Sequence, residues 1–477
     1  MKIRDKLVPT LSVVLMSVFP VMFLYFKNAG EAHFSGCLKP AAVYLAAGLV
    51  IFALAICVTR SSYVGAVYAM PFILLFQNYS FLERAVNSFF PVLKYWHILP
   101  IAIVLLLHIC WLINRRLPRN VAKDIVLVLS LVFLGLILLN GAMAAPAIIR
   151  TGASRERDEA FSEQIEKTDS DDSNIYWLLF DEYSNFDIIK KYYHYDNDGF
   201  ARFLEQRGFH VSYDGINDSQ QTNTIVANYV SLEYVADDSM TISERVSIRH
   251  HNNEIFSTMR ANGYQIEELG EDTVQFFPTD AKPVKAVSTS MEGDDFYTIL
   301  IKSSALCITI PETQSGKIEE IKGVMDAFQA KEFYQENGRF VVLYEDLPHQ
   351  PFVFRQDGSQ NPILKWHDWV DPEVYLGQYI YTTSLLEILI DNIIENDPNA
   401  IIVLQSDHSA RSLQDEEGHY LIDKFDRRHF LNAVYYKGED VSEIDGQSGV
   451  NTWRLILSRR FGVELPVLEV PVSEYEF

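Results

Sequence analysis

Asp407 and His408 follow the apolar run 401–404 and are the residues of this chain best suited to chemistry. A run of β-branched and aliphatic residues predicts a buried strand, and ligands of open α/β sheets gather at the carboxyl ends of such strands. A carboxylate and an imidazole placed there can bind one divalent cation, and Arg411 can contact an anionic substrate beside it. The structural alternative is an aspartate that caps a helix next to a hydrogen-bonded histidine.

A second predicted strand, 175–180, ends in two acids, Asp181 and Glu182. Buried carboxylates are costly unless they are paired or bind a metal, so acids at a second strand end favour an oxygen-rich cation site shared with Asp407. Glu182 is either a further ligand or a solvated acid beside the site.

Thr222 comes before the apolar stretch 225–235 and is predicted to lie at a helix N-terminus. The helix dipole places partial positive charge near its hydroxyl there, and beside a metal that hydroxyl can lose its proton and act as a nucleophile. Thr224 is the rival nucleophile. A helix cap without a chemical role is the structural alternative for Thr222.

The order of these parts is a strand followed by an acid, then a threonine at a helix start, then a late strand followed by Asp-His. It resembles the alkaline phosphatase superfamily, in its sulfatase-like membrane branch. Other stretches also look like signatures of that branch, namely 200–209, 252–264, 348–352, 432–433 and 451–454. The resemblance covers roughly residues 174 to 465 and implies an α/β alkaline-phosphatase-like domain with a central mixed sheet. The branch includes lipoteichoic acid synthase and the phosphoethanolamine and phosphoglycerol transferases of bacterial envelopes, but substrate does not follow from fold.

The resemblance implies a role for each candidate site residue. Metal ligands are implied at four positions, Asp181, Thr222, Asp407 and His408. Thr222 is also the implied nucleophile. His349 matches the substrate-side histidine of a Pro-His-x-Pro motif, although by itself it can also be a turn histidine before Pro351. The implied cofactor is a divalent metal ion, Mn²⁺ or Zn²⁺, with Mg²⁺ or Ca²⁺ as alternatives.

Three features depart from known patterns. Ser409 stands where the family usually has glycine after the Asp-His pair. Tyr344 stands where it often has a histidine, five residues before the motif histidine, and this puts a second metal ion in doubt. Sulfate ester hydrolysis is disfavoured, because the stretch 222–226 lacks the Cys or Ser, the Pro and the Arg that surround the formylglycine site of sulfatases.

Five apolar stretches in the first 150 residues are each close to the roughly 20 residues that span a bilayer; they lie near 7–26, 41–58, 63–81, 95–113 and 124–146. A cleaved signal peptide is the alternative for the first stretch. Eight Lys and Arg residues lie on the N-terminal side of the predicted bundle and four on the other side. The positive-inside rule therefore places the N-terminus in the cytoplasm. Everything after the fifth span is then periplasmic or extracellular, as in a multi-pass protein of the bacterial inner membrane.

The rest of the chain is predicted to form a linker, 151–173, and one catalytic domain, 174–477. The linker carries many charges and few apolar side chains. Alternating strand-like and helix-like patterns suit a single α/β domain after it. The clearest helix is 375–395, whose apolar residues recur at helical spacing and which leads into the strand before Asp407. No structural disulfide is predicted among the four cysteines.

Charge is distributed unevenly along the chain. The part after residue 150 holds 27 Lys and Arg against 59 Asp and Glu, a formal balance of −32. This excess of acid argues against nucleic acid as a partner and against a broad grip on anionic lipid headgroups. An anionic donor would be held locally, by the metal and Arg411. Arg427 and Arg428 are further candidates, with a solvated loop as their alternative.

Taken together, the sequence predicts a membrane-anchored, metal-dependent transferase. A phospholipid would donate a phosphoglycerol or phosphoethanolamine type of group to Thr222, and an acceptor hydroxyl on a surface glycan or lipid would then receive it. Five spans beside the site favour a donor that stays in the membrane. The alternatives are a phosphodiesterase that passes the group to water and an inactive scaffold in polysaccharide assembly.

Overall fold

The structure is a computed structural model of the 477-residue chain. It describes residues 4–27, 34–90, 92–114, 118–162, 172–251, 254–270, 273, 277, 294–309, 314–364, 369–415 and 419–471. Contacts divide the chain into two compact units, which are described separately. Unit 1 comprises residues 1–149 and 290–312, and unit 2 comprises 150–289 and 313–477. One division falls near residue 150, where the sequence predicts the end of the membrane-spanning part. The segment 290–312, which lies within the predicted range 174–477, is grouped by its contacts with unit 1.

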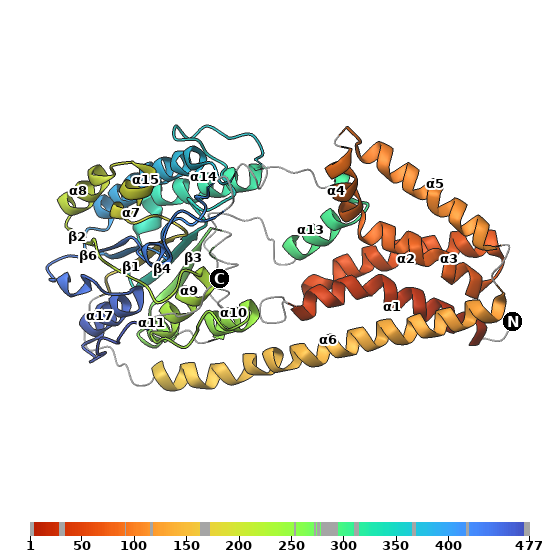
Figure 1. The fold of residues 1–477 in the computed structure, drawn as a ribbon. Coiled ribbons are helices and arrows are strands. Elements are labelled where there is room, and N and C mark those ends of the chain that lie inside the picture. Colours follow the sequence, from red (N-terminus) through yellow and green to blue (C-terminus); the bar gives the residue numbers. More distant parts are fainter. Residues whose placement is uncertain are drawn as a thin grey trace. The chain divides into compact units, whose positions relative to one another are not determined.

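Unit 1 is helical (Figure 1). Its elements are α1 (Arg4–Lys27), η1 (Phe34–Cys37), α2 (Leu38–Thr59), α3 (Ser62–Gln77), α4 (Tyr79–Phe89), α5 (Tyr95–Asn114), α6 (Arg119–Ser162), α13 (Asp294–Ser303) and η2 (Cys307–Thr309). Four of the described helices, α1, α2, α5 and α6, are long and apolar enough to span a membrane. The bent pair α3 and α4 makes a fifth candidate span, with an angle of 67° between its two helices.

Two of the predicted segments differ from the structure in length. The third apolar stretch, 63–81, is broken at Asn78, where α3 ends and the amphipathic α4 begins. The predicted linker, 151–173, is partly helical, because α6 continues to Ser162. An abundance of charged residues therefore marked the end of the apolar span but not the end of the helix.

Unit 2 is built on a six-stranded mixed sheet with the order β2-β6-β5-β1-β4-β3. The strands are β1 (Ile175–Phe180), β2 (Phe209–Ser212), β3 (Gln265–Leu269), β4 (Arg339–Glu345), β5 (Ile401–Ser406) and β6 (Asn432–Tyr436). β1 lies between β4 and β5 and is parallel to both. β6 is antiparallel to β5 and β2. The structure thus has the mixed central sheet that the sequence predicted.

Helices cover both faces of this sheet (Figure 1). α7 (Phe186–Tyr193), α8 (Asp198–Gln206), α14 (Ser315–Gln329) and α15 (Pro372–Asn396) contribute to one core cluster. α9 (Thr222–Ser231), α11 (Glu254–Ala261) and α17 (Gly449–Phe461) contribute to the other, and α10 (Ile242–His251) packs beside α9. Short elements complete the unit: η3 (Lys331–Tyr334), α16 (Lys424–Arg427) and η5 (Ser442–Ile444).

Side chains along β1 point alternately to the two faces of the sheet, so they are shared between the two core clusters. Tyr176 and Leu178 belong to the first cluster, whereas Trp177 and Leu179 belong to the second. This is the period-2 geometry of a strand buried on both sides. Trp177 packs edge-on against Trp453 of α17, with ring centroids 5.0 Å apart, so α17 is held to the sheet by large aromatic contacts.

The predicted number of membrane crossings can be tested with reporter fusions. A reporter that works only outside the cytoplasm should be active when it is fused after residue 160, and inactive when it is fused near Arg116, because an odd number of spans separates the N-terminus from unit 2. Reporter activity in intact cells, normalised to expression, measures this. The reverse pattern would show that α3 and α4 do not form a crossing.

Candidate metal centre

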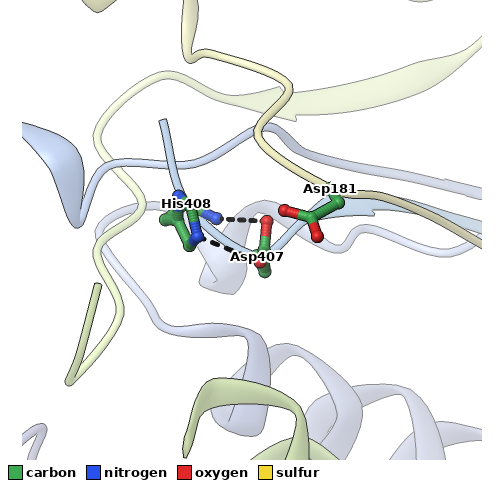
Figure 2. Close-up of side chains that lie close together, drawn as sticks. All are labelled: Asp181, Asp407 and His408. Carbon is green, nitrogen blue, oxygen red and sulfur yellow. Dashed lines mark hydrogen bonds and ion pairs between the residues drawn. The ribbon is translucent and has the colours of Figure 1, made fainter. Parts of the chain in front are cut away.

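The site is set by three parallel strands that end at one edge of the sheet. Phe180, the last residue of β1, pairs in register with Ser406 of β5 and Glu345 of β4. The residues that follow β1 and β5 therefore emerge side by side, as expected at the carboxyl ends of parallel strands. Asp181 follows β1, and Asp407 with His408 follows β5. All three are buried, and one ligand atom from each lies within 4.8 Å of the others (Figure 2).

Asp407 presents only one carboxylate oxygen to the centre of this group. Its Oδ1 accepts two backbone N–H groups, from Glu182 at 3.0 Å and from His408 at 2.8 Å. Its Oδ2 is buried, makes no hydrogen bond of good geometry with a described residue, and lies 3.2 Å from His408 Nε2. The backbone thus orients the carboxylate as a ligand with one free oxygen.

Asp181 is arranged in the same way by a different partner. The hydroxyl of Tyr344 donates to its Oδ2 at 2.9 Å, while Oδ1 is buried and has no hydrogen-bond partner among the described residues. Tyr344 is the position at which the sequence departs from the histidine of the resembled family. Its phenol fixes an acid of the site, where a histidine would instead offer a ring nitrogen to a metal.

His408 and Thr222 supply the remaining donor atoms. His408 Nδ1 lies 2.9 Å from the carbonyl oxygen of Ser409, so the ring donates its Nδ1–H there and its Nε2 carries the lone pair. Thr222 Oγ1 lies 3.3 Å from that Nε2. Thr222 is the first residue of α9, so the partial positive charge of the helix N-terminus acts near its hydroxyl.

These residues fit a divalent cation. Two buried carboxylate oxygens that lack hydrogen bonds are costly in an apolar interior, and a cation between them removes that cost. Asp181 Oδ1, Asp407 Oδ2, His408 Nε2 and Thr222 Oγ1 form a mixed oxygen and nitrogen set, which suits zinc or a harder divalent ion. The structure thus brings together all four residues that the sequence predicted as ligands.

Burial and the nearby charges shift the pKa values of Asp181, Asp407 and His408. Burial, and next the charge of Asp407, raises the pKa of Asp181 well above its usual range. Burial also acts to raise the pKa of Asp407, but the His408 ring, the Thr222 hydroxyl and the two backbone N–H groups outweigh it and lower that pKa. Burial lowers the pKa of His408, which keeps the ring neutral and able to bind a metal.

Thr224, the rival nucleophile, is engaged elsewhere. It is fully buried, its hydroxyl donates to Asp238 at 2.7 Å, and it accepts a bond from Arg245 at 2.9 Å. These contacts tie α9 to the segment that follows it. Of the two threonines, only Thr222 has its hydroxyl beside His408.

Glu182 is neither a further acid of the metal group nor a solvated side chain, the two roles expected from the sequence. It is fully buried and pairs with Arg411, whose Nε lies 2.9 Å from its carboxylate. Its backbone is left-handed, with φ of 58°, and its carbonyl accepts a bond from Tyr375 at 2.7 Å. That conformation costs on the order of 1 kcal/mol.

His349 lies beside Arg411. Its Nδ1 is 2.6 Å from the carbonyl of Gln350, so the Nδ1–H is donated there, and Nε2 accepts from Arg411 Nη2 at 3.2 Å. Burial acts to lower the pKa of His349, but the carboxylates of Asp181 and Glu182 raise it overall. Arg411 is 30% exposed, so part of its guanidinium remains open to a ligand.

The structure also shows the surroundings of three nearby residues. Ser409, which stands where the resembled family usually has glycine, has a buried hydroxyl that accepts from the backbone N–H of Asn185 at 3.0 Å and donates to the carbonyl of His429 at 2.7 Å. Arg427 is buried and donates to the carbonyl of Ile422, so it is not part of a solvated loop. Arg428 donates to the carbonyl of Asn217.

Sequence reasoning missed Asn217. This fully buried side chain donates to the carbonyl of Asp407 at 2.6 Å and to the hydroxyl of Tyr229 at 2.5 Å, and it accepts from the N–H of Gly449 at 3.1 Å. It therefore ties the ligand-bearing turn to α9 and α17. No spacing in the sequence signals this role, because all three partners are distant along the chain or belong to other elements.

Comparison with known proteins gives structural matches only. No protein-family model matches the chain, and no curated protein matches it. The chain is similar to lipooligosaccharide phosphoethanolamine transferase A from Neisseria meningitidis, an integral membrane protein, with 12% identity, a TM-score of 0.42 and 95% of each chain covered. It is also similar to the C-terminal periplasmic domain of EcEptC from Escherichia coli in complex with Zn, with 12% identity, a TM-score of 0.43, and 66% of this chain and 90% of that one covered.

A sulfatase is among the matches as well. BT1596, a 2-O GAG sulfatase, is 12% identical with a TM-score of 0.37, and the match covers 64% of this chain and 73% of that one. Phosphoethanolamine transferases are among the proteins that the sequence resemblance named, within the sulfatase-like membrane branch of the alkaline phosphatase superfamily. Because these TM-scores are below 0.5, the function proposed below depends on the residues of this chain.

Substitution of Asp407 tests the metal assignment. In Asp407→Asn the amide oxygen would accept the two backbone N–H groups and leave the NH₂ group facing the cation, so a ligand is lost while the local hydrogen bonds remain. Metal affinity should fall by more than the roughly 10–100-fold that loss of an outer-shell partner costs. Elemental analysis after dialysis against a metal buffer measures occupancy.

Asp218 offers a matched control. It is another buried carboxyl, bonded to Asn228 at 2.8 Å, and Asp218→Asn should retain the metal. Full occupancy in Asp407→Asn would remove Asp407 from the ligand set, and loss of metal in both variants would point to general unfolding.

Proposed function

We propose that the chain is a membrane-bound, metal-dependent transferase that moves a phospho-alcohol group, of the phosphoglycerol or phosphoethanolamine type, from a phospholipid to an envelope glycan or lipid. The observation that supports this proposal is the position of the Thr222 hydroxyl, which lies at the start of a helix and 3.3 Å from His408 Nε2. It is next to two buried carboxylate oxygens that have no hydrogen-bond partner among the described residues. A divalent cation is the proposed cofactor, with Mn²⁺ and Zn²⁺ the first choices. Unit 2 would act outside the cytoplasmic membrane.

The first step transfers the group to Thr222. The bound cation would lower the pKa of the threonine hydroxyl and polarise a phosphoryl oxygen of the donor. Thr222 Oγ1 attacks phosphorus in line, the bond to the lipid alcohol breaks, and that alcohol leaves with a proton. The N-terminus of α9 favours the negative charge that develops on the phosphoryl oxygens.

The second step returns Thr222 to its free form. An acceptor hydroxyl attacks the phosphodiester on Thr222, the bond between Oγ1 and phosphorus breaks, and the threonine regains its proton. His349 Nε2 carries a lone pair, because the Nδ1–H is donated to the carbonyl of Gln350, so it is suited to take the proton of the acceptor. Arg411 contacts this histidine and would bind the anionic phosphoryl group.

The covalent intermediate gives the direct test. Purified protein incubated with phosphatidylglycerol or phosphatidylethanolamine, without acceptor, should carry a phosphodiester adduct on the peptide that contains Thr222. Its mass would identify the group, and fragmentation would locate it. Thr222→Ala should abolish the adduct and transfer, because the nucleophilic oxygen is removed.

Thr224→Ala is the control for this experiment. It should keep the adduct, with unfolding free energy lowered by about 1–2 kcal/mol through the loss of buried hydrogen bonds. An adduct on Thr224 would move the role by two residues. Rapid release of the headgroup phosphate into water without acceptor would favour a phosphodiesterase, and the absence of both metal and adduct would favour a scaffold.

Variants of the Glu182 and Arg411 pair can distinguish its effect on the stability of the fold from its effect on substrate binding. Arg411→Ala leaves the buried Glu182 carboxylate unpaired and should lower the unfolding free energy by about 2–3 kcal/mol, less than for a fully buried pair because Arg411 is 30% exposed. Adding Glu182→Gln should restore stability but not the affinity of metal-loaded protein for inorganic phosphate. Calorimetric titration and thermal unfolding measure the two effects.

The buried pair of Arg339 and Glu267, 2.8 Å apart on neighbouring strands, is the matched control. Arg339→Ala should also destabilise, and Glu267→Gln should also compensate, but phosphate affinity should stay unchanged throughout. Phosphate binding of normal strength in Arg411→Ala would exclude Arg411 as the anion contact.

A further inference from the structure

The helix α13 lies in the sequence of the catalytic part but packs within unit 1. Leu300 and Ile301 are buried in one cluster with Val21, Cys37 and Tyr44, and the partly buried residues around them also come from residues 1–149 and 290–312. Within the described residues, therefore, Leu300 and Ile301 are covered by side chains of α1, η1, α2 and α3, whereas Ile299 is exposed. Figure 1 shows α13 beside α4 at one end of these helices.

Polar contacts also join α13 and the residues just after it to the other helices of unit 1. The last carbonyl groups of a helix have no partner within the helix. Here the hydroxyl of Tyr44 donates to the carbonyl of Leu300 at 2.6 Å, and Ser80 donates to the carbonyl of Lys302. Just after the helix, Ala305 accepts from the hydroxyl of Tyr95 at 2.7 Å.

Two further contacts fix the position of this segment. The backbone N–H of Ala305 donates to the carbonyl of Phe76 at 2.7 Å. The ammonium of Lys39 lies 4.4 Å from the centre of the Tyr297 ring, in a cation–π contact. The backbone of 300–305 is thus hydrogen-bonded to four different elements of unit 1. A nonspecific apolar contact would not need these directed hydrogen bonds.

We propose that residues 294–309 are a docking element, by which the catalytic part of the chain binds a preformed receptor on unit 1. The receptor is formed by the C-terminal ends of α1 and α3, the N-terminal ends of α2 and α5, and α4. Unit 2 is then held to unit 1 at two points of the sequence, the covalent connection after α6 and the non-covalent docking of α13. This inference does not depend on the proposed chemistry.

The docking also determines how the helices cross the membrane. No candidate span follows α6 in the described part of the chain, so the proposal implies that α13 lies on the side of the membrane on which α6 ends. The ends of α1 and α3 and the beginnings of α2 and α5 must face that side too. Under this proposal α1, α2, the bent pair α3 and α4, α5 and α6 cross in alternating directions. Five crossings place the N-terminus on the side opposite to unit 2.

Cleavage of the covalent connection tests the docking. A specific protease site is inserted within residues 163–171 of the full-length protein, which is then reconstituted in lipid nanodiscs and cut. The C-terminal fragment should remain with the nanodiscs in size-exclusion chromatography, because α13 stays docked. In Tyr44→Phe with Tyr95→Phe, each lost hydrogen bond should weaken docking by about fivefold, so a larger fraction should elute as free fragment.

Two controls make the result decisive. Tyr68→Phe removes a buried hydroxyl of the same unit that has no hydrogen-bond partner among the described residues, and it should release no more fragment than the parent protein. Replacement of 290–312 by a Gly-Ser segment of equal length should release nearly all of it. Free fragment from the parent protein, or retention after the Gly-Ser replacement, would overturn the proposal. Equal retention in the double tyrosine variant would overturn the assigned contacts.

Discussion

Two buried carboxylate oxygens, Asp181 Oδ1 and Asp407 Oδ2, face one region without a hydrogen bond to a described residue, and the rest of the site depends on this constraint. The parallel pairing of β1 with β5 forces the two acids together. Each carboxylate is fixed through its other oxygen, by two backbone N–H groups on Asp407 and by the phenol of Tyr344 on Asp181. Such an arrangement is unfavourable unless a cation lies between the oxygens, and this is the physical argument for the proposed metal site.

A second pair of charges lies beside the first group and interacts with it. Glu182, whose backbone is left-handed, pairs with Arg411. Burial acts to lower the pKa of Arg411, but the charges of Glu182, Asp181 and Asp407 together raise it. With neutral histidines, the charges of Asp181, Glu182 and Asp407 are balanced by Arg411 and one divalent cation. A site of near-zero net charge can accept an anionic phosphodiester, even though the part of the chain after residue 150 carries a formal charge of −32. In the proposed site, Arg411 and the cation would neutralise the three carboxylates locally. The broad positive surface potential that many phosphate-binding proteins use would then not be needed.

The sequence predicted those features whose causes are local. The strands before Asp181 and Asp407 are short apolar runs that end in polar residues, and the helix near 375–395 has an apolar period, so each could be predicted from neighbouring residues. The roles of Glu182 and Asn217 could not be predicted, because they follow from a positive φ and from hydrogen bonds to residues far away in the sequence. The place of α13 was missed for the same reason, since its apolar residues pack against helices more than two hundred positions earlier.

The position of α13 matters because it makes an interaction intramolecular. Whether docked or undocked, α13 stays on the same molecule as its receptor, because the chain joins them through unit 2. Such tethering raises the effective concentration, so a contact that would be weak between separate molecules can be largely formed. A few hydrogen bonds from Tyr44, Ser80 and Tyr95 and the burial of two apolar side chains are enough under that condition. The same contacts would leave the docking reversible, so the catalytic unit can be held by unit 1 without being fixed to it permanently.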